Sequence, residues 1–164
     1  VFGALREMVD QEPTIEVVYP VHLSPAVQEV AHDLLGNHER IHLIEPLDVF
    51  DFHNLASRSY FIMSDSGGVQ EEAPSLGKPV LVLRDTTERP EGVQAGTLKL
   101  VGTDPGTVKS TMSELLNDEK LYSEMANARN PYGDGKASAR IVQAIKHYFA
   151  LGDAAEEFHE GDEN

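Results

Sequence analysis

The sequence predicts an α/β fold built on a Rossmann-like, doubly wound parallel sheet. Three observations lead to this class. Apolar runs rich in β-branched residues alternate with segments of helical periodicity along the 164 residues. Several runs, such as 79–85 (PVLVLRD), are continuously apolar rather than alternating, which is typical of parallel strands buried on both faces. The helical segments fall between the strands, where a parallel sheet needs its crossover connections.

Start and stop signals bound the predicted elements. The helix 24–36 begins with Ser24 at the N-cap and Pro25 at the first helical position, and it stops at Gly36. The segment 84–92 (RDTTERPEG) follows a strand and is predicted to be a loop. The predicted strands are 15–22, 41–47, 60–65, 79–85 and 98–102, and the predicted helices are 24–36, 48–58, 68–77, 104–118, 119–128 and 136–150.

Composition narrows the classes of function. The formal charge of −15, from 28 acidic and 13 basic residues, repels nucleic-acid phosphates and anionic lipid, so neither nucleic acid nor membrane is expected as a partner. The absence of cysteine excludes disulfides, thiolate catalysis and thiolate metal sites, and it agrees with a cytoplasmic setting. An anionic ligand would have to be held locally, by backbone N–H groups or a few placed cations.

The two ends of the chain differ from its middle. The opening VFGALREMVD has the pattern of the middle of an amphipathic helix and lacks an initiator Met, so we interpret the chain as a fragment or a processed piece. The end is polar and acidic, without the apolar content needed to pack. We therefore expect one domain over 1–150 and a disordered acidic tail over 151–164.

A glycine turn between a strand and a helix is the main candidate site. The strand ending at Met63 runs into Ser64-Asp65-Ser66-Gly67-Gly68, and a helix starts near Gly68. In open parallel sheets, ligands lie beyond the carboxyl ends of the strands, and a helix N-terminus there offers unpaired N–H groups. Glycines let a phosphate approach the backbone, so the turn is a candidate anion site.

The turn alone leaves a second interpretation open. Ser66 can be a simple N-cap, and the glycines can serve only to make the turn. The motif is neither G-x-G-x-x-G nor a Walker loop, so it gives no support to NAD or ATP chemistry.

Charged residues near the turn extend the candidate site. Glu72 lies about a turn and a half into the helix, where a carboxylate can accept hydrogen bonds from vicinal ribose hydroxyls. Its neighbour Glu71 is expected to be solvated. Arg89, in the loop 84–92, lies at the same edge of the sheet and is a candidate contact for a phosphate or a base.

The run SDSGGVQEEAPSLGKPVLVLRDTTERPEGVQAGT resembles, nearly without interruption, the C-terminal domain of bacterial non-hydrolysing UDP-N-acetylglucosamine 2-epimerases. Other landmarks of that family occur in the same order, and the resemblance covers residues 1–149. The matching stretches are VVYPVHLSP, IHLIEPLDVFDFHNL and NPYGDGKAS.

The resemblance implies a fold and a reaction. The fold is the C-terminal half of a GT-B-type architecture, in which two Rossmann-like domains face a cleft. The reaction is the reversible interconversion of UDP-GlcNAc and UDP-ManNAc, in which UDP is eliminated to leave 2-acetamidoglucal and is then added back with inversion at C2. The resemblance implies no cofactor and no metal, a homodimeric parent protein, and a role in cell envelope polysaccharide biosynthesis.

The resemblance also assigns roles to matched residues. Ser66, Gly67 and Gly68 resemble the diphosphate-binding turn, and Glu72 is similar to the residue that holds the ribose hydroxyls. Phe52 resembles a residue of the uracil pocket, and Arg89 falls at a position of the nucleotide site. His22 resembles a residue that contacts a second, regulatory UDP-GlcNAc. His42, His53 and His147 carry no expected role.

Part of the family pattern is absent from this sequence. The family's His-Arg motif ends a strand just before the helix that opens this chain, and the acidic residues that handle the C2 proton belong to the N-terminal domain. We therefore expect no catalytic residue in this piece and no epimerase activity from it alone. The lost first strand would be central, beside 15–22 and 61–65. Either another segment or another chain fills its place, or the order of the strands adjusts.

Two other functions are compatible with the same site. A nucleotide-sugar glycosyltransferase donor domain shares the phosphate turn and a ribose-binding Glu. A stand-alone module that binds UDP-sugars without chemistry would need only the residues present here.

Overall fold

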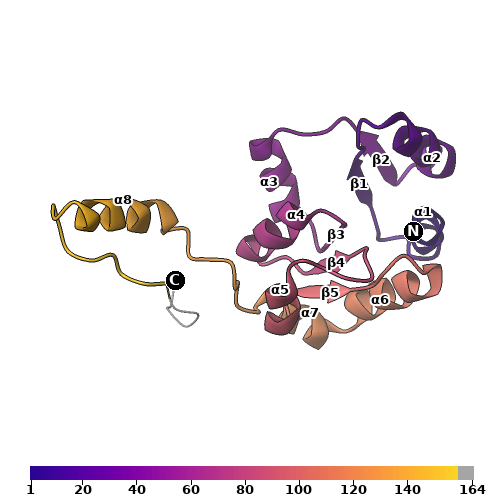
Figure 1. Cartoon of the computed structure of the whole chain (residues 1–164). Helices are drawn as coiled ribbons and strands as arrows, with labels where there is room; N and C mark the ends of the chain where they lie inside the picture. The colour runs from indigo at the N-terminus through magenta and orange to yellow at the C-terminus, as the bar shows by residue number, and fades with distance from the viewer. Residues whose placement is uncertain (159–164) are drawn as a thin grey trace.

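Short parallel strands with helices between them make up the body of the protein (Figure 1). The computed structural model describes residues 1–158, and the order of its elements follows the predicted alternation. The strands are β1 Val17–Pro20, β2 Ile41–Ile44, β3 Ile62–Ser64, β4 Val80–Val82 and β5 Leu98–Leu100. The helices are α1 Phe2–Gln11, α2 Pro25–Leu35, α3 Val49–Arg58, α4 Gly67–Glu72, the 3₁₀ turn η1 Ala73–Leu76, α5 Pro90–Ala95, α6 Pro105–Asn117, α7 Glu119–Ala126 and α8 Ala137–Tyr148.

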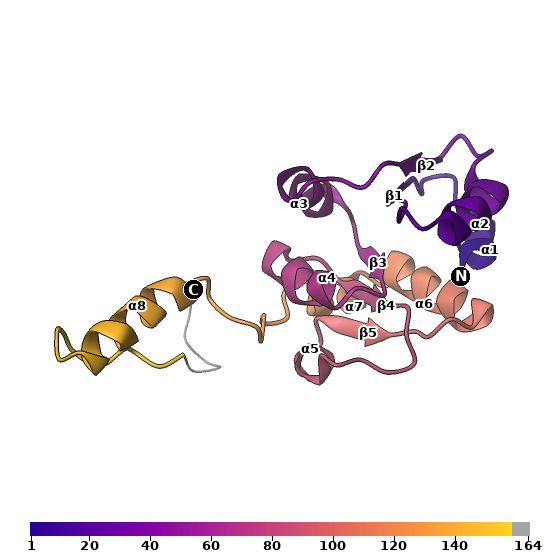
Figure 2. The same cartoon turned by 45° about the horizontal axis from the view of Figure 1, so that its top comes forward.

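The strands form two separate parallel sheets. In one, β1 pairs with β2, with Val17 opposite Ile41. In the other, the order is β3-β4-β5, with Ile62 opposite Val80 and Val80 opposite Leu98. Within residues 1–158, β1 and β3 do not pair with each other, and Figure 2 shows the two sheets as distinct parts. The sheet is therefore interrupted at the place where the sequence predicts a missing strand.

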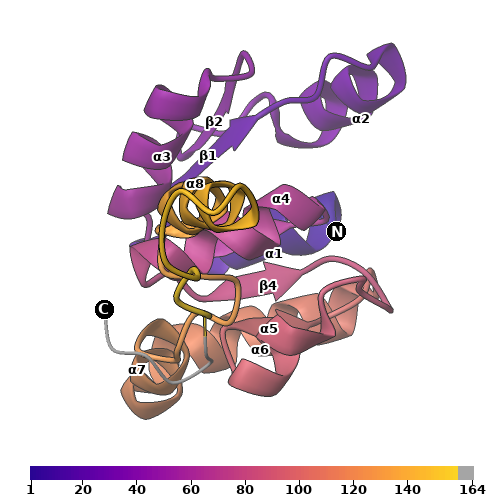
Figure 3. The same ribbon diagram turned by 60° about the vertical axis from the view of Figure 1, so that its left-hand side comes forward.

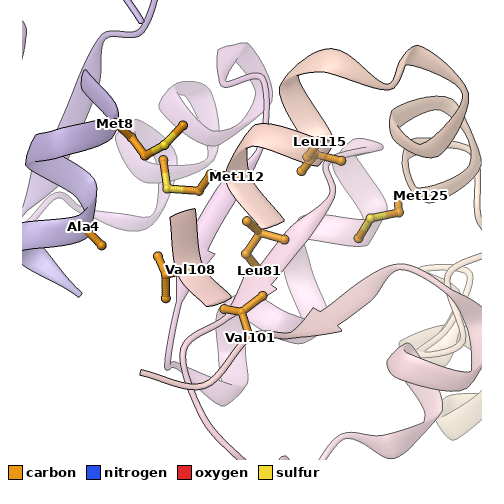
Figure 4. Close-up of a cluster of buried hydrophobic side chains, with 8 residues drawn as sticks. All are labelled: Ala4, Met8, Leu81, Val101, Val108, Met112, Leu115 and Met125. Carbon is orange, nitrogen blue, oxygen red and sulfur yellow. The ribbon is translucent and has the colours of Figure 1, made fainter. Parts of the chain in front are cut away.

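Helix α1 joins the two halves. Its residues Ala4 and Met8 are buried in a cluster with β4 and α6, which Figure 4 shows around Leu81 and Met112. From the same helix, Val9 is buried against side chains of α2 and β2. One short helix thus contributes to two hydrophobic clusters, and burial of its apolar side chains is the main attraction between the halves.

Aspartates begin three of the helices. Asp48 accepts a hydrogen bond from the Asp51 N–H at 2.9 Å, Asp104 from Thr107 at 2.8 Å and Asp118 from Leu121 at 2.9 Å. These bonds satisfy N–H groups that the first turn of a helix leaves unpaired. Ser24 precedes α2 as predicted, although its side chain makes no capping bond.

The prediction of a loop over 84–92 is wrong at its end. Helix α5 begins at Pro90, and Arg89 is the residue before its first turn. Proline is well suited to the first helical position because its missing N–H would have no intrahelical partner there. Arg89 is consequently held at the start of a helix rather than in the middle of a loop.

Helix α8 projects from the body, and none of its residues is buried (Figure 1). Figure 3 is viewed from the side on which it projects. At its base, Asp134 accepts two hydrogen bonds from Arg140, at 2.7 and 2.8 Å. Hydrogen bonding to Arg140 is the main reason why the pKa of Asp134 lies well below its usual range. Residues 151–158 of the predicted tail form no helix or strand, and 159–164 lie outside the described residues.

In the part of the chain that the structure describes, no helix is both long and apolar enough to cross a membrane.

The packing around α5 gives a test of the fold. A methyl group on Gly92 would collide with the Tyr132 hydroxyl and lie 2.5 Å from Leu98 Cδ1. We expect Gly92→Ala to destabilise the protein by about 1–3 kcal/mol, as overpacking does. Gly3→Ala is the matched control, because it also lies in a helix but its methyl group meets no atom within 4 Å. That control gains about 0.5–1 kcal/mol from helix propensity. Urea unfolding of both variants measures the difference, and equal effects would contradict the packing described here.

Candidate functional site

The glycine turn lies open at the carboxyl end of β3. Asp65, Ser66 and Gly68 are exposed, and α4 starts at Gly67 and continues directly into η1. Ser66 occupies the N-cap position with extended backbone angles, φ −78° and ψ 128°, and its hydroxyl makes no capping hydrogen bond. The first N–H groups of the helix have no intrahelical acceptor. The turn therefore presents backbone donors and a hydroxyl to the surface.

A buried glutamine fixes the turn to the loop after β4. Gln70 is fully buried, and its Nε2 donates to the Ser66 carbonyl oxygen at 3.2 Å. The Thr87 hydroxyl donates to Gln70 Oε1 at 2.6 Å and accepts from the Arg89 N–H at 3.0 Å. These bonds satisfy both ends of the amide, which a buried polar group requires. They also hold the segment with Arg89 next to the turn.

Arg89 is paired with Glu71. Its Nε donates to Glu71 Oε1, and this hydrogen bond is the main reason why the pKa of Arg89 is raised. The expectation that Glu71 is merely solvated is therefore wrong, because its carboxylate positions the guanidinium. A Cβ on Gly67 would lie 3.9 Å from Arg89 Nη2. The positive charge predicted for the site is thus beside the turn.

Glu88 lies on the same side of the turn. Its Oε1 would be 3.0 Å from a Cβ on Gly67, and its Oε2 accepts from Arg84 Nη1 at 2.8 Å. Its own backbone N–H and the Arg84 charge hold the pKa of Glu88 below its usual value. No motif or spacing in the sequence singles out this carboxylate. Because its side chain is flexible and exposed, it can move aside for a phosphate.

Glu72 lies next to Gly68, whereas Arg89 and Glu88 lie next to Gly67. Its Oε2 lies 2.9 Å from His53 Nε2, and its Oε1 would be 3.9 Å from a Cβ on Gly68. The Ser66 hydroxyl oxygen is also 3.9 Å from that point. The structure therefore brings together Ser66, Gly67, Gly68, Glu72 and Arg89, as the sequence predicted.

Phe52 belongs to the neighbouring helix α3. It is half-buried, and its ring centroid lies 6.1 Å from that of His53. The contact between His53 and Glu72 places helix α3 beside the turn, and Phe52 lies on that helix. His53 itself was expected to have no role, and no motif or spacing in the sequence signals its contact.

His22 lies in the other half of the molecule, just after β1. It is exposed, and its Nδ1 accepts from the Ser24 N–H at 3.1 Å. Within residues 1–158, no hydrogen bond or ion pair joins His22 to the glycine turn. Its separation from the turn is compatible with the separate regulatory site that was predicted, and that role stays a prediction.

An open cavity of about 530 Å³ adjoins the turn. It is lined by Glu71, Glu72 and Ser75, by residues of the loop before α8 such as Tyr132, and by residues of α8 such as Arg140. The cavity does not include the glycines, so it extends the site beyond Glu72 rather than covering the turn. Residues 1–158 contain no group of three or more His, Cys, Asp or Glu side chains that could hold a metal ion.

Parallel strands, connecting helices and a ligand-accessible turn at the carboxyl end of β3 define a Rossmann-like α/β protein. A family model described as UDP-N-acetylglucosamine 2-epimerase matches residues 1–146. The chain belongs to the UDP-N-acetylglucosamine 2-epimerase family, which confirms the resemblance found in the sequence.

Similar proteins support the same family. The UDP-N-acetylglucosamine 2-epimerase of Bacillus subtilis (strain 168) is 60% identical over 148 residues, which are 90% of this chain and 39% of the relative. An S. aureus MnaA–UDP co-structure matches with a TM-score of 0.93 and 57% identity, over 96% of this chain and 44% of that one. A UDP-GlcNAc 2-epimerase from Neisseria meningitidis bound to UDP-GlcNAc matches with a TM-score of 0.86 and 48% identity, over 90% of this chain and 40% of that one. The chain thus spans about two fifths of the length of the proteins it matches.

A methyl group added at Gly67 is expected to change phosphate affinity without lowering the stability of the fold. Gly67 has no left-handed backbone angle, and the atom nearest its added Cβ is the flexible end of Glu88. We expect Gly67→Ala to leave the thermal midpoint unchanged or slightly higher, because alanine favours the helix by about 0.5–1 kcal/mol. The same methyl would keep a phosphate from the backbone, so pyrophosphate affinity falls at least about tenfold, the loss of one charge-assisted hydrogen bond. Calorimetric titration measures that affinity, and an unchanged value would remove the turn from phosphate binding.

Proposed function

We propose that this chain is the UDP-binding part of a UDP-N-acetylglucosamine 2-epimerase. The observation that carries the proposal is the open glycine turn, with Arg89 at one side and Glu72 at the other. The whole protein would interconvert UDP-GlcNAc and UDP-ManNAc by eliminating UDP and adding it back.

The diphosphate would lie on the turn. The protein has a formal charge of −15, so its surface as a whole repels an anion, and the binding energy has to come from local donors. Backbone N–H groups at Gly67 and Gly68, the Ser66 hydroxyl and the Arg89 guanidinium supply such donors. Arg89 is held in place by Glu71, so it is oriented before the ligand arrives.

The nucleoside would extend from the turn towards α3. Glu72 can accept hydrogen bonds from the two ribose hydroxyls, as acidic residues do in nucleotide-binding α/β folds. Phe52, on the helix that Glu72 contacts through His53, would line the place of the uracil. The order of phosphate, ribose and base along the site then follows the order of glycine turn, Glu72 and Phe52.

The same donors suit the chemistry of elimination. When the glycosidic C–O bond of UDP-GlcNAc breaks, negative charge develops on the leaving UDP. Fixed N–H groups and a guanidinium stabilise that charge without reorganising during the reaction. Proton transfer at C2 needs an acid–base group, and we assign that step to the part of the protein outside this chain.

We infer that a further domain of the whole protein completes the site. It would form the other half of a GT-B-type pair and bring the proton-transfer residues, and a strand from the same region would pair with both β1 and β3. His22 would bind a second, regulatory UDP-GlcNAc, in a cytoplasmic homodimer that serves cell envelope polysaccharide synthesis. The chain alone would bind UDP without converting the sugar.

The role of Glu72 can be tested with two ligands. We expect Glu72→Ala to lower the affinity for UDP by about tenfold or more, since charged hydrogen bonds contribute about 1.5–3 kcal/mol. The affinity for pyrophosphate should stay nearly unchanged, because pyrophosphate has no ribose. Calorimetric titration of the chain with each ligand measures the difference. Equal losses for UDP and pyrophosphate would remove Glu72 from ribose binding.

The reaction can be tested with the whole protein and with this chain. UDP-GlcNAc is supplied with no acceptor, and UDP-ManNAc is followed by proton NMR. We expect conversion by the whole protein and none by the chain alone. A glycosyltransferase would instead form no UDP-ManNAc and would need an acceptor, whereas a binding module would bind UDP and leave the sugar unchanged in both forms.

A further inference from the structure

His53 connects helix α3 to the carboxylate next to the turn. Its Nε2 lies 2.9 Å from Glu72 Oε2, and the two residues are 19 positions apart in the chain. Both side chains are partly exposed, 41% for His53 and 50% for Glu72. The contact is therefore between side chains that would each be mobile if the other were absent.

The contact uses one oxygen of Glu72 and orients the other. While Oε2 faces His53, Oε1 faces Gly68, on the side of the Ser66 hydroxyl. A carboxylate has about four lone-pair positions, so an imidazole N–H and two ribose hydroxyls can be accepted together. The oxygen that faces the turn is the one that a ribose beside a turn-bound diphosphate would reach first.

We propose that His53 is a positioning residue, which holds the Glu72 carboxylate in the orientation that accepts the ribose hydroxyls. This inference rests on the proposed function, since it assumes that the turn binds a nucleoside diphosphate. Without His53, Glu72 would occupy several rotamers, and binding would have to order it at an entropic cost. With His53, the orientation exists before the ligand arrives.

The contact has little importance for stability. Partly exposed pairs of polar side chains contribute little to folding because water already solvates both groups. Helix α3 is anchored independently by Ala56, which is buried. Loss of the imidazole is therefore expected to change ligand binding far more than the thermal midpoint.

The chain offers a matched control. His42 Nε2 lies 2.9 Å from Glu16 Oε1, and this pair is also partly exposed. It joins β2 to the residue before β1, in the half of the molecule without the turn. His42→Leu thus removes a similar pair without touching the candidate site.

The experiment compares His53→Leu, His53→Gln, His42→Leu, Glu72→Ala and the double variant of His53→Leu with Glu72→Ala. The ligands are UDP, its 2′,3′-dideoxy analogue and pyrophosphate.

We expect His53→Leu to lower the affinity for UDP by about fivefold, a loss of the size that partly exposed side-chain pairs give. The affinities for the other two ligands should stay unchanged. His53→Gln, which keeps an N–H donor near the position of Nε2, restores most of the affinity, and His42→Leu has no effect. The double variant binds UDP no more weakly than Glu72→Ala alone, because the two residues act together.

The outcomes separate the two proposals. If the wild-type chain fails to bind UDP, both proposals are overturned. If it binds UDP and His53→Leu changes nothing, or weakens all three ligands alike, or adds its full effect to that of Glu72→Ala, then His53 is not a positioning residue and the proposed function stands.

Discussion

The buried amide of Gln70 is the interaction on which the candidate site depends. It joins the Ser66 carbonyl at the glycine turn to the Thr87 hydroxyl in the next loop, and Thr87 in turn holds the backbone of Arg89. A buried amide left without partners is costly, so these two segments are held in one arrangement. The donors at the turn and the guanidinium beside it therefore form a preorganised set, although they come from separate parts of the chain.

Pairing of side chains bears on how an acidic protein could present the proposed anion site. Several side chains beside the turn are paired: Arg89 with Glu71, Arg84 with Glu88, and His53 with Glu72. Pairing orients these side chains around the turn. The two adjacent glutamates thus have different partners: Glu71 contacts Arg89 and Glu72 contacts His53, which in the proposed function would place one at the phosphate and the other at the ribose.

The sequence predicts what depends on neighbours in the chain and misses what depends on packing. The glycine turn, the alternation of strands and helices along the chain and the positions of Glu72 and Arg89 follow from local patterns and from the geometry of parallel sheets. The Glu71–Arg89 and His53–Glu72 contacts span 18 and 19 positions, and only the packing of loop and helices on α4 brings them together. Helix α5 was not predicted from the sequence, although a signal for it was present. Pro90 stands at its first position, and the same rule predicted α2 from Pro25.

The interruption between the two sheets has a consequence for the site. The N–H groups of Val17 and Val21 donate towards β2, and the N–H group of Ile62 donates towards β4. In each strand the alternate residue, Val18 in β1 and Met63 in β3, therefore directs its backbone N–H and C=O groups to the opposite edge of its strand. Burial, and then the nearby charge of Asp65, raises the pKa of Tyr19 on β1. A parallel strand inserted there would satisfy both edges and would end between His22 and the glycine turn. Under the proposed function, its last residues would lie beside the bound diphosphate, at the carboxyl edge of the sheet.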